Sequence, residues 1–159
     1  MKQVLFILLC AVFTLGATAQ IPSVNLKDMN GKTVDTASLA KTGKPVIISF
    51  WATWCSPCKR ELNSYMDYIE DWNEEFGVTL IAVSIDDQRT ALRVAPYVNS
   101  AEWEYDVLLD TNSDFKRAMQ VNNVPHTFLI NAAGKIVWQN NNYSVGDEEE
   151  LYEQLEKLK

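Results

Sequence analysis

The sequence predicts a single α/β domain in which a mixed sheet is flanked by helices, and three observations lead to that fold class. Two nearly continuous apolar runs, 46–51 and 79–85, have the composition of strands that are covered on both faces. An amphipathic segment, 56–76, joins them and predicts a strand-helix-strand unit. Two later strand patterns around a short turn predict an antiparallel hairpin that ends the sheet. A length of 159 residues with 47% hydrophobic content suits one domain.

The first predicted elements are a hairpin, a central strand and a long helix. The hairpin turns at Asn30 and Gly31, and strand 46–51 follows it. Segment 56–76 is closed by Gly77, which is typical of a helix end. Its apolar residues recur at helical spacing and are Leu62, Tyr65, Met66, Ile69, Trp72 and Phe76. We therefore expect one continuous amphipathic helix over this segment.

The middle of the chain predicts an extra helical segment between two strands. Strand 79–85 is followed by a helix over 90–98 that is bent or ended near Pro96. A short strand, 107–109, and a helix, 113–120, come next.

The C-terminal part predicts a hairpin and a last helix. Strands 127–130 and 136–139 flank a turn at 131–134. Asp147 can cap the helix that follows, and three glutamates in its first turn complement the positive end of the helix dipole. One face of this helix is apolar, with Leu151, Leu155 and Leu158. The acidic cluster is therefore expected to serve the helix terminus rather than to form a binding tail.

The first nineteen residues have the pattern of a secretory signal peptide. Lys2 is the only early charge, 4–15 is almost wholly apolar, and Ala17 to Ala19 are small residues that a signal peptidase accepts. The apolar run is too short for a membrane-spanning helix, which needs about 20 residues. We expect a signal peptide over 1–19 that is cleaved after Ala19, and an exported, periplasmic domain over 20–159, in preference to a membrane-anchored form.

Cysteine usage and charge limit the function further. Cleavage after Ala19 would remove Cys10, so the exported chain would hold two cysteines, Cys55 and Cys58, in a compartment where disulfides persist. The formal net charge is −7, from 14 basic and 21 acidic side chains. No cluster of Lys and Arg suited to binding phosphates is present in the sequence, which argues against nucleic acid as a partner.

The two cysteines stand where strand 46–51 gives way to the predicted helix. This places Cys55 in the first helical turn, where unpaired N–H groups and the helix dipole stabilise a thiolate. Cys58 lies three residues on, close enough for a disulfide, and Pro57 is tolerated early in a helix. Cys55 is therefore predicted to be a nucleophile and Cys58 its resolving partner in thiol-disulfide exchange, with no cofactor.

Four other roles could use the same residues. A purely structural bridge needs no turnover, and half of a zinc site is disfavoured because structural zinc takes four ligands. A copper-handling protein could bind copper(I) through Cys55, Cys58 and His126, since copper(I) prefers soft thiolates. A peroxidase is less favoured, because such enzymes need an isolated reactive cysteine more than a partner three residues away.

The segment from Phe50 to Cys58, with Val124 and Pro125 about seventy positions later, resembles the thioredoxin superfamily and, more narrowly, its exported TlpA/ResA branch. The resemblance covers roughly 24–158 and includes the Trp-Cys-x-Pro-Cys core, the extra helical segment and the Pro-x-Thr-Phe-Leu-Ile stretch. It implies a thioredoxin-like fold with an N-terminal hairpin and a helical insert.

The resemblance also implies an activity and a substrate site. The activity is reduction of disulfides in exported proteins, apocytochromes before haem attachment among them, with electrons from a membrane or soluble donor. An oxidase or isomerase is the alternative, which the reduction potential distinguishes. The Val124–Pro125 bond is expected to be cis, with the Val124 backbone pairing to an extended substrate segment. Trp54 would shield one side of the disulfide, unless it is an ordinary partly buried aromatic residue.

The chain departs from the family pattern at three positions. Ser49 stands where thioredoxins carry a buried Asp, and Thr79 is aligned with a glutamate of ResA-like members. We therefore expect no carboxylate beside Cys58, so that water or another group takes its proton. His126, the sole histidine, stands where relatives often have Thr. Our hypothesis is that an imidazolium there favours the Cys55 thiolate, the alternative being a surface loop histidine satisfied by water.

Overall fold

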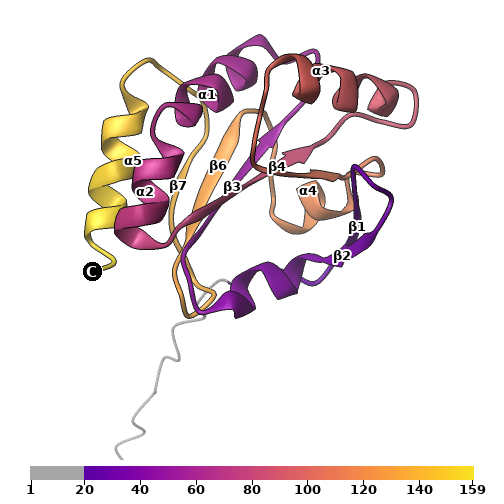
Figure 1. Cartoon of the computed structure of the whole chain (residues 1–159). Helices are drawn as coiled ribbons and strands as arrows, with labels where there is room; N and C mark the ends of the chain where they lie inside the picture. The colour runs from indigo at the N-terminus through magenta and orange to yellow at the C-terminus, as the bar shows by residue number, and fades with distance from the viewer. Residues whose placement is uncertain (1–19) are drawn as a thin grey trace, which may run out of the picture.

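A seven-stranded mixed sheet forms the middle layer of the protein (Figure 1). The computed structural model describes residues 20–159, so the predicted signal peptide, its cleavage site and Cys10 lie outside the described range. The strands are β1 (Asn25–Asp28), β2 (Thr33–Asp35), β3 (Val46–Trp51), β4 (Thr79–Ser84), β5 (Asp106–Leu109), β6 (His126–Ile130) and β7 (Ile136–Asn140). Their order across the sheet is β2-β1-β5-β4-β3-β6-β7.

Strand directions agree with the predicted mixed sheet. β3, β4 and β5 are parallel to one another, whereas β6 pairs antiparallel with β3 and β7 antiparallel with β6. The N-terminal hairpin of β1 and β2 joins the sheet through antiparallel pairing of β1 with β5. Because every residue of β3 is buried, its continuous apolar run is explained by cover on both faces.

Helices cover the two faces of the sheet. The α-helices are α1 (Ser56–Met66), α2 (Ile69–Phe76), α3 (Val94–Ser100), α4 (Asp114–Ala118) and α5 (Asp147–Glu156), and the 3₁₀ helices are η1 (Thr36–Thr42) and η2 (Ala91–Arg93). Side chains of α1, α2, α3 and α5 belong to one apolar core, which includes both cysteines. Side chains of α4 and η1 join the second core on the other face. None of the helices within residues 20–159 has the length and apolarity that crossing a bilayer requires.

Three details of the predicted helices are wrong. The expected helix over 56–76 breaks at Asp67 and Tyr68, whose N–H groups bond carbonyls only three residues back and so end α1. The single helix expected over 90–98, bent or ended near Pro96, is η2 followed by α3, and Pro96 lies in the first turn of α3, where its missing N–H has no helical partner to lose. Asp147 is the first residue of α5 rather than its cap, which is Gly146.

Candidate active site

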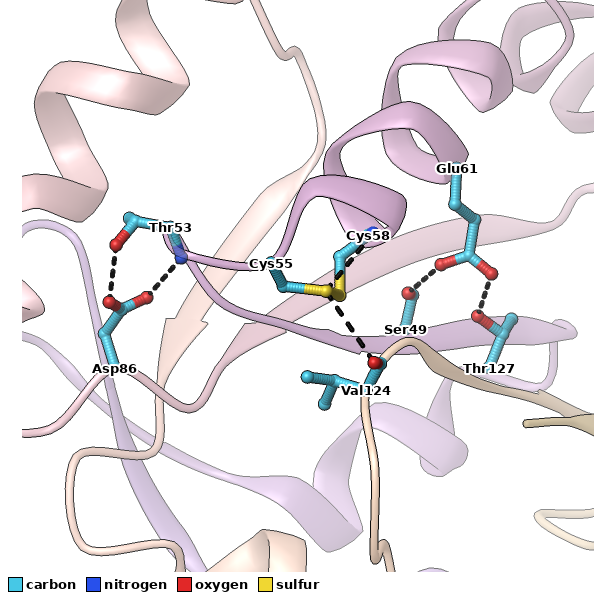
Figure 2. Close-up of a disulfide and its surroundings, with 8 residues drawn as sticks. All are labelled: Ser49, Thr53, Cys55, Cys58, Glu61, Asp86, Val124 and Thr127. Atoms are coloured by element: carbon cyan, nitrogen blue, oxygen red, sulfur yellow. Dashed lines mark hydrogen bonds between the residues drawn. A yellow bond between two sulfur atoms is a disulfide. The ribbon is translucent and has the colours of Figure 1, made fainter. Parts of the chain in front are cut away.

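Cys55 and Cys58 form a disulfide at the N-terminus of α1, directly after β3 (Figure 2). Their Cα atoms are 5.4 Å apart, within the range that a disulfide requires. The sequence placed Cys55 in the first turn of this helix, but in the structure Cys55 is the residue that caps α1. Its Sγ lies 3.3 Å from the backbone N–H of Cys58, which donates to it. A thiolate at Cys55 would therefore receive a hydrogen bond from the helix terminus, which favours the ionised form.

The two sulfur-bearing residues differ in access to solvent. Cys58 is fully buried, with 0% of its surface exposed, whereas Cys55 is 5% exposed at the edge of the site. The neighbouring Trp54 is 61% exposed. Cys55 is consequently the cysteine that a partner can reach, and Cys58 lies behind it. Whether Trp54 shields the disulfide stays a prediction.

Val124 and Pro125 lie beside the disulfide. The Val124–Pro125 peptide bond is cis, and the carbonyl oxygen of Val124 lies 3.7 Å from Cys55 Sγ (Figure 2). Pairing between β3 and β6 begins only at His126, so the backbone of Val124 lies outside that ladder. The structure thus brings Val124 and Pro125, about seventy residues away in sequence, to the reactive sulfur.

A buried carboxylate stands near the dithiol, contrary to the expectation from Ser49 and Thr79. Glu61 is fully buried and accepts hydrogen bonds from Ser49 Oγ at 2.8 Å and Thr127 Oγ1 at 2.9 Å (Figure 2). The Tyr65 hydroxyl adds a third bond at 3.3 Å. Burial disfavours the charged form and raises the pKa of Glu61 to about 7, although these three bonds act in the opposite direction.

The sequence did contain a signal for Glu61. Positions 58, 61, 62 and 65 of α1 share the helix face that is buried against the sheet. A glutamate on that face, three residues after Cys58, must bury its carboxyl group beside the same strand that carries Ser49. The carboxylate near Cys58 is thus supplied by helix α1 and not by a strand.

His126 lies on the other face of the sheet, which does not support its predicted role. Its Nε2 is 3.0 Å from Gln139 Oε1, and its ring stacks on Phe128 with the ring centroids 4.3 Å apart. Phe128 belongs to the core opposite the cysteines, whereas Thr127 points toward Glu61. Burial lowers the pKa of His126, which disfavours the imidazolium that the tuning hypothesis needs. The alternative of a surface loop histidine is also wrong, because His126 is 7% exposed at the start of β6.

The same placement argues against the copper site proposed from sequence. With His126 bonded to Gln139 on the far face, the three suggested ligands Cys55, Cys58 and His126 are not assembled into one site. Among residues 20–159, no group of three or more His, Cys, Asp or Glu side chains is arranged to hold a metal ion.

Comparison with known proteins matches this arrangement to a family. The model of the AhpC/TSA family matches residues 17–139. The thiol-disulfide oxidoreductase ResA of Bacillus subtilis strain 168 is 35% identical over 116 residues, which are 73% of this chain and 62% of that protein. ResA of Bacillus thuringiensis strain Al Hakam is 32% identical over 120 residues, 76% of this chain and 66% of that protein. The chain therefore spans just under two thirds of the length of these curated relatives.

Solved structures give longer matches. An uncharacterised thioredoxin-like protein from Porphyromonas gingivalis is 48% identical, with a TM-score of 0.78 over 90% of this chain and 94% of that one. A putative thiol:disulfide interchange protein DsbE from Chlorobium tepidum is 26% identical, with a TM-score of 0.77 over 89% of this chain and 96% of that one. Together with the family match, these similarities mean that the chain belongs to the AhpC/TSA family and has a thioredoxin-like fold.

Proposed function

We propose that the chain is a thiol-disulfide oxidoreductase that reduces disulfides of exported proteins. The observation that carries the proposal is the Cys55–Cys58 disulfide at a helix N-terminus, with Cys55 5% exposed and Cys58 fully buried behind it. Relatives named thiol-disulfide oxidoreductase and thiol:disulfide interchange protein support the same activity. A disulfide with one cysteine more accessible than the other is suited to exchange rather than to permanent cross-linking.

The proposed cycle is two thiolate exchanges. The Cys55 thiolate attacks a partner disulfide, so that a mixed disulfide forms and the partner's other sulfur leaves as a thiolate. Cys58 then loses its proton and attacks Cys55 Sγ, and the second partner sulfur leaves. The partner gains two electrons and the Cys55–Cys58 pair is oxidised. An external dithiol donor must reduce the pair before the next cycle.

Glu61 is the proposed proton acceptor for Cys58. It is buried on the same face of α1, and its pKa of about 7 allows it to take or release a proton near neutral pH. A carboxyl group with an ordinary pKa would be a weaker base at that pH. Glu61 can thus act as the proton acceptor that is missing at positions 49 and 79.

The surroundings of the disulfide favour a protein segment as substrate. Cys55 is 5% exposed beside the exposed Trp54, and a groove of about 680 Å³ between α2 and α5 includes none of the dithiol residues in its walls. The Val124 backbone lies outside the β3–β6 ladder and beside Cys55, where an extended segment could add to it as a strand.

Export itself rests on the signal peptide predicted over 1–19. Sequencing the N-terminus of the exported protein should find Gln20 first; a retained Met1 would contradict it.

Trapping tests the proposed activity. Cys58→Ala removes the resolving sulfur, so this variant should accumulate partners as mixed disulfides on Cys55. The matched control, Cys55→Ser with Cys58→Ala, should trap none. Wild-type protein should reduce insulin disulfides, and Cys55→Ser should lose that activity by at least about a thousandfold. Equal trapping by both variants would contradict the assignment of the nucleophile.

A second measurement separates reductase from oxidase. Equilibration of the pair against glutathione gives the reduction potential, and we expect a value near that of reducing thioredoxins, about −270 mV. A potential near −120 mV would instead indicate a disulfide donor.

A further inference from the structure

A second buried carboxylate, that of Asp86, accepts hydrogen bonds from the turn that carries Cys55. The turn runs from Ala52 to Cys55 and is closed by the Cys55 N–H, which donates to Ala52 O at 3.0 Å. Inside it, Thr53 donates its backbone N–H to one oxygen of Asp86 at 2.8 Å and its hydroxyl to the other at 2.6 Å. Figure 2 shows this pair on the opposite side of the disulfide from Glu61. Asp86 thus holds both the main chain and the side chain of Thr53.

Asp86 is fixed by the end of β4 and not by a cation. Ile85 N–H donates to Trp51 O at 2.9 Å, which carries the pairing of β3 and β4 one residue past Ser84. The Ser84 hydroxyl donates to Asp86 at 2.9 Å, and Asp86 is 1% exposed. None of the ion pairs among residues 20–159 includes this carboxylate. A buried carboxylate without a countercharge is costly unless hydrogen bonds compensate it, and the bonds from Thr53 and Ser84 do so here.

The turn from Ala52 to Cys55 determines where the Cys55 sulfur points. Trp54 projects outward, whereas Cys55 turns inward to cap α1 and to lie against Val124 O. In the oxidised protein, the disulfide also restrains Cys55. When the disulfide opens, that restraint is lost, and the bonds between Thr53 and Asp86 remain to keep the turn in shape.

We propose that Asp86 is a positioning residue that acts through Thr53 to keep Cys55 within reach of Cys58 in the reduced protein. The proposal rests on the proposed function of the dithiol. The step it serves is release of the mixed disulfide: Cys58 Sγ bonds to Cys55 Sγ, the bond from Cys55 to the partner sulfur breaks, and the partner leaves as a thiolate. Because this step is intramolecular, its rate and equilibrium depend on the effective concentration of one sulfur at the other.

Two substitutions separate positioning from charge. Thr53→Val removes the hydroxyl donor but keeps the backbone bond and the charge of Asp86. Asp86→Asn removes the charge and keeps the shape of the side chain. Positioning predicts that Thr53→Val lowers the equilibrium constant for closing the disulfide by about tenfold, which is about 30 mV toward a more oxidising pair. Asp86→Asn should shift it in the same direction. Thr79→Val, a change at an exposed position at the other end of β4, is the matched control and should leave the equilibrium constant for closing the disulfide unchanged.

The experiment measures equilibrium and rate on the whole exported chain. Glutathione titration gives the equilibrium constant. Reaction of the reduced protein with dithiobis(nitrobenzoate) gives a mixed disulfide on Cys55, and release of thionitrobenzoate by Cys58 gives the intramolecular rate, which should fall several-fold in Thr53→Val. Wild-type values in Thr53→Val, with a change only in Asp86→Asn, would mean that Asp86 acts by its charge and would overturn the proposal. Loss of thermal stability alone in both variants would overturn it too.

The titration needs only a dithiol that can close. It therefore gives a result for the Asp86 proposal even where the wild-type protein reduces no protein disulfide. Failure of insulin reduction would count against the proposed function, whereas an unshifted equilibrium in Thr53→Val would count against the positioning role alone.

Discussion

The two faces of β6 each bury a titratable side chain, and their surroundings are opposite in kind. On the face toward α1, Thr127 contacts Glu61, which accepts three hydrogen bonds. On the face toward α4, His126 has one hydrogen bond, to Gln139, and stacks on Phe128. Burial acts against the charged form of both, so it raises the pKa of Glu61 to about 7 and lowers the pKa of His126.

The difference shows which face can exchange protons at neutral pH. Glu61 is brought to a pKa at which it is about half protonated near pH 7, and it shares its face with both cysteines. Burial lowers the pKa of His126, which disfavours its charged form. Its neighbours are apolar rings, with Phe128 packed edge-on to Phe50 at 6.0 Å and Phe50 against Phe115 at 5.2 Å. One face therefore holds the dithiol and Glu61, while the other holds packed aromatic rings.

The largest expected effect is on stability and comes from the packing face. Phe128→Ala removes a ring that is 2% exposed and should lower the free energy of unfolding by about 3–5 kcal/mol, measured by urea titration. The reduction potential of the folded protein should stay that of the wild type. The control Val137→Ala, at a 44% exposed position on the neighbouring strand, should cost less than about 1 kcal/mol. A shifted potential in Phe128→Ala would mean that the faces are coupled and would break the comparison.

The next effect concerns the pH dependence of stability on the dithiol face. A carboxyl group whose pKa is raised on folding binds its proton more tightly in the native state, so its contribution is fully present below pH 4.5. It is lost as the pH rises through about 7, and the loss amounts to about 3 kcal/mol for a shift of this size. Glu61→Gln should remove this loss, which urea titrations at pH 5 and pH 8 can measure.

The same variant tests the role of Glu61 in the reaction. The rate at which Cys58 releases thionitrobenzoate should increase in the wild type as the pH rises through about 7. This increase should be absent in Glu61→Gln. Glu70→Gln on the exposed side of α2 is the control and should keep both pH dependences. An unchanged rate profile in Glu61→Gln, with altered stability, would leave Glu61 as a structural group only.

Much of this comparison could be predicted from sequence, because strands that are covered on both faces have a continuous apolar pattern. The runs at 46–51 and 79–85 predicted the central strands, and the hairpin at the C-terminus follows from its turn. The position of the cysteines at the strand-helix junction follows from the same pattern. The break between α1 and α2 could not be predicted, since neither Asp67 nor Tyr68 is a helix-breaking residue.

His126 was placed wrongly because the predicted start of the strand was one residue too late. A strand starting at Thr127 leaves His126 in a loop beside the cysteines, whereas β6 starts at His126. Once residue 126 belongs to the strand, alternation puts its side chain on the face of Phe128 and Ile130, away from Thr127. The buried helix face could indicate Glu61, but the partners of Asp86 come from β4 and from the turn at Thr53, and local patterns do not contain those contacts.

The smallest expected effect on the dithiol comes from His126→Thr. The ring hydrogen-bonds to Gln139 on the packing face, so we expect alkylation of reduced protein to give the wild-type pKa for the Cys55 thiol. The stability effect should have the opposite sign to that of Glu61. A histidine whose pKa is lowered on folding contributes stability above pH 6.5 that is lost as the pH falls, and the variant should lack this acid-side loss. A shifted Cys55 pKa would revive the tuning hypothesis, because it would mean that the imidazole acts on the sulfur through the sheet.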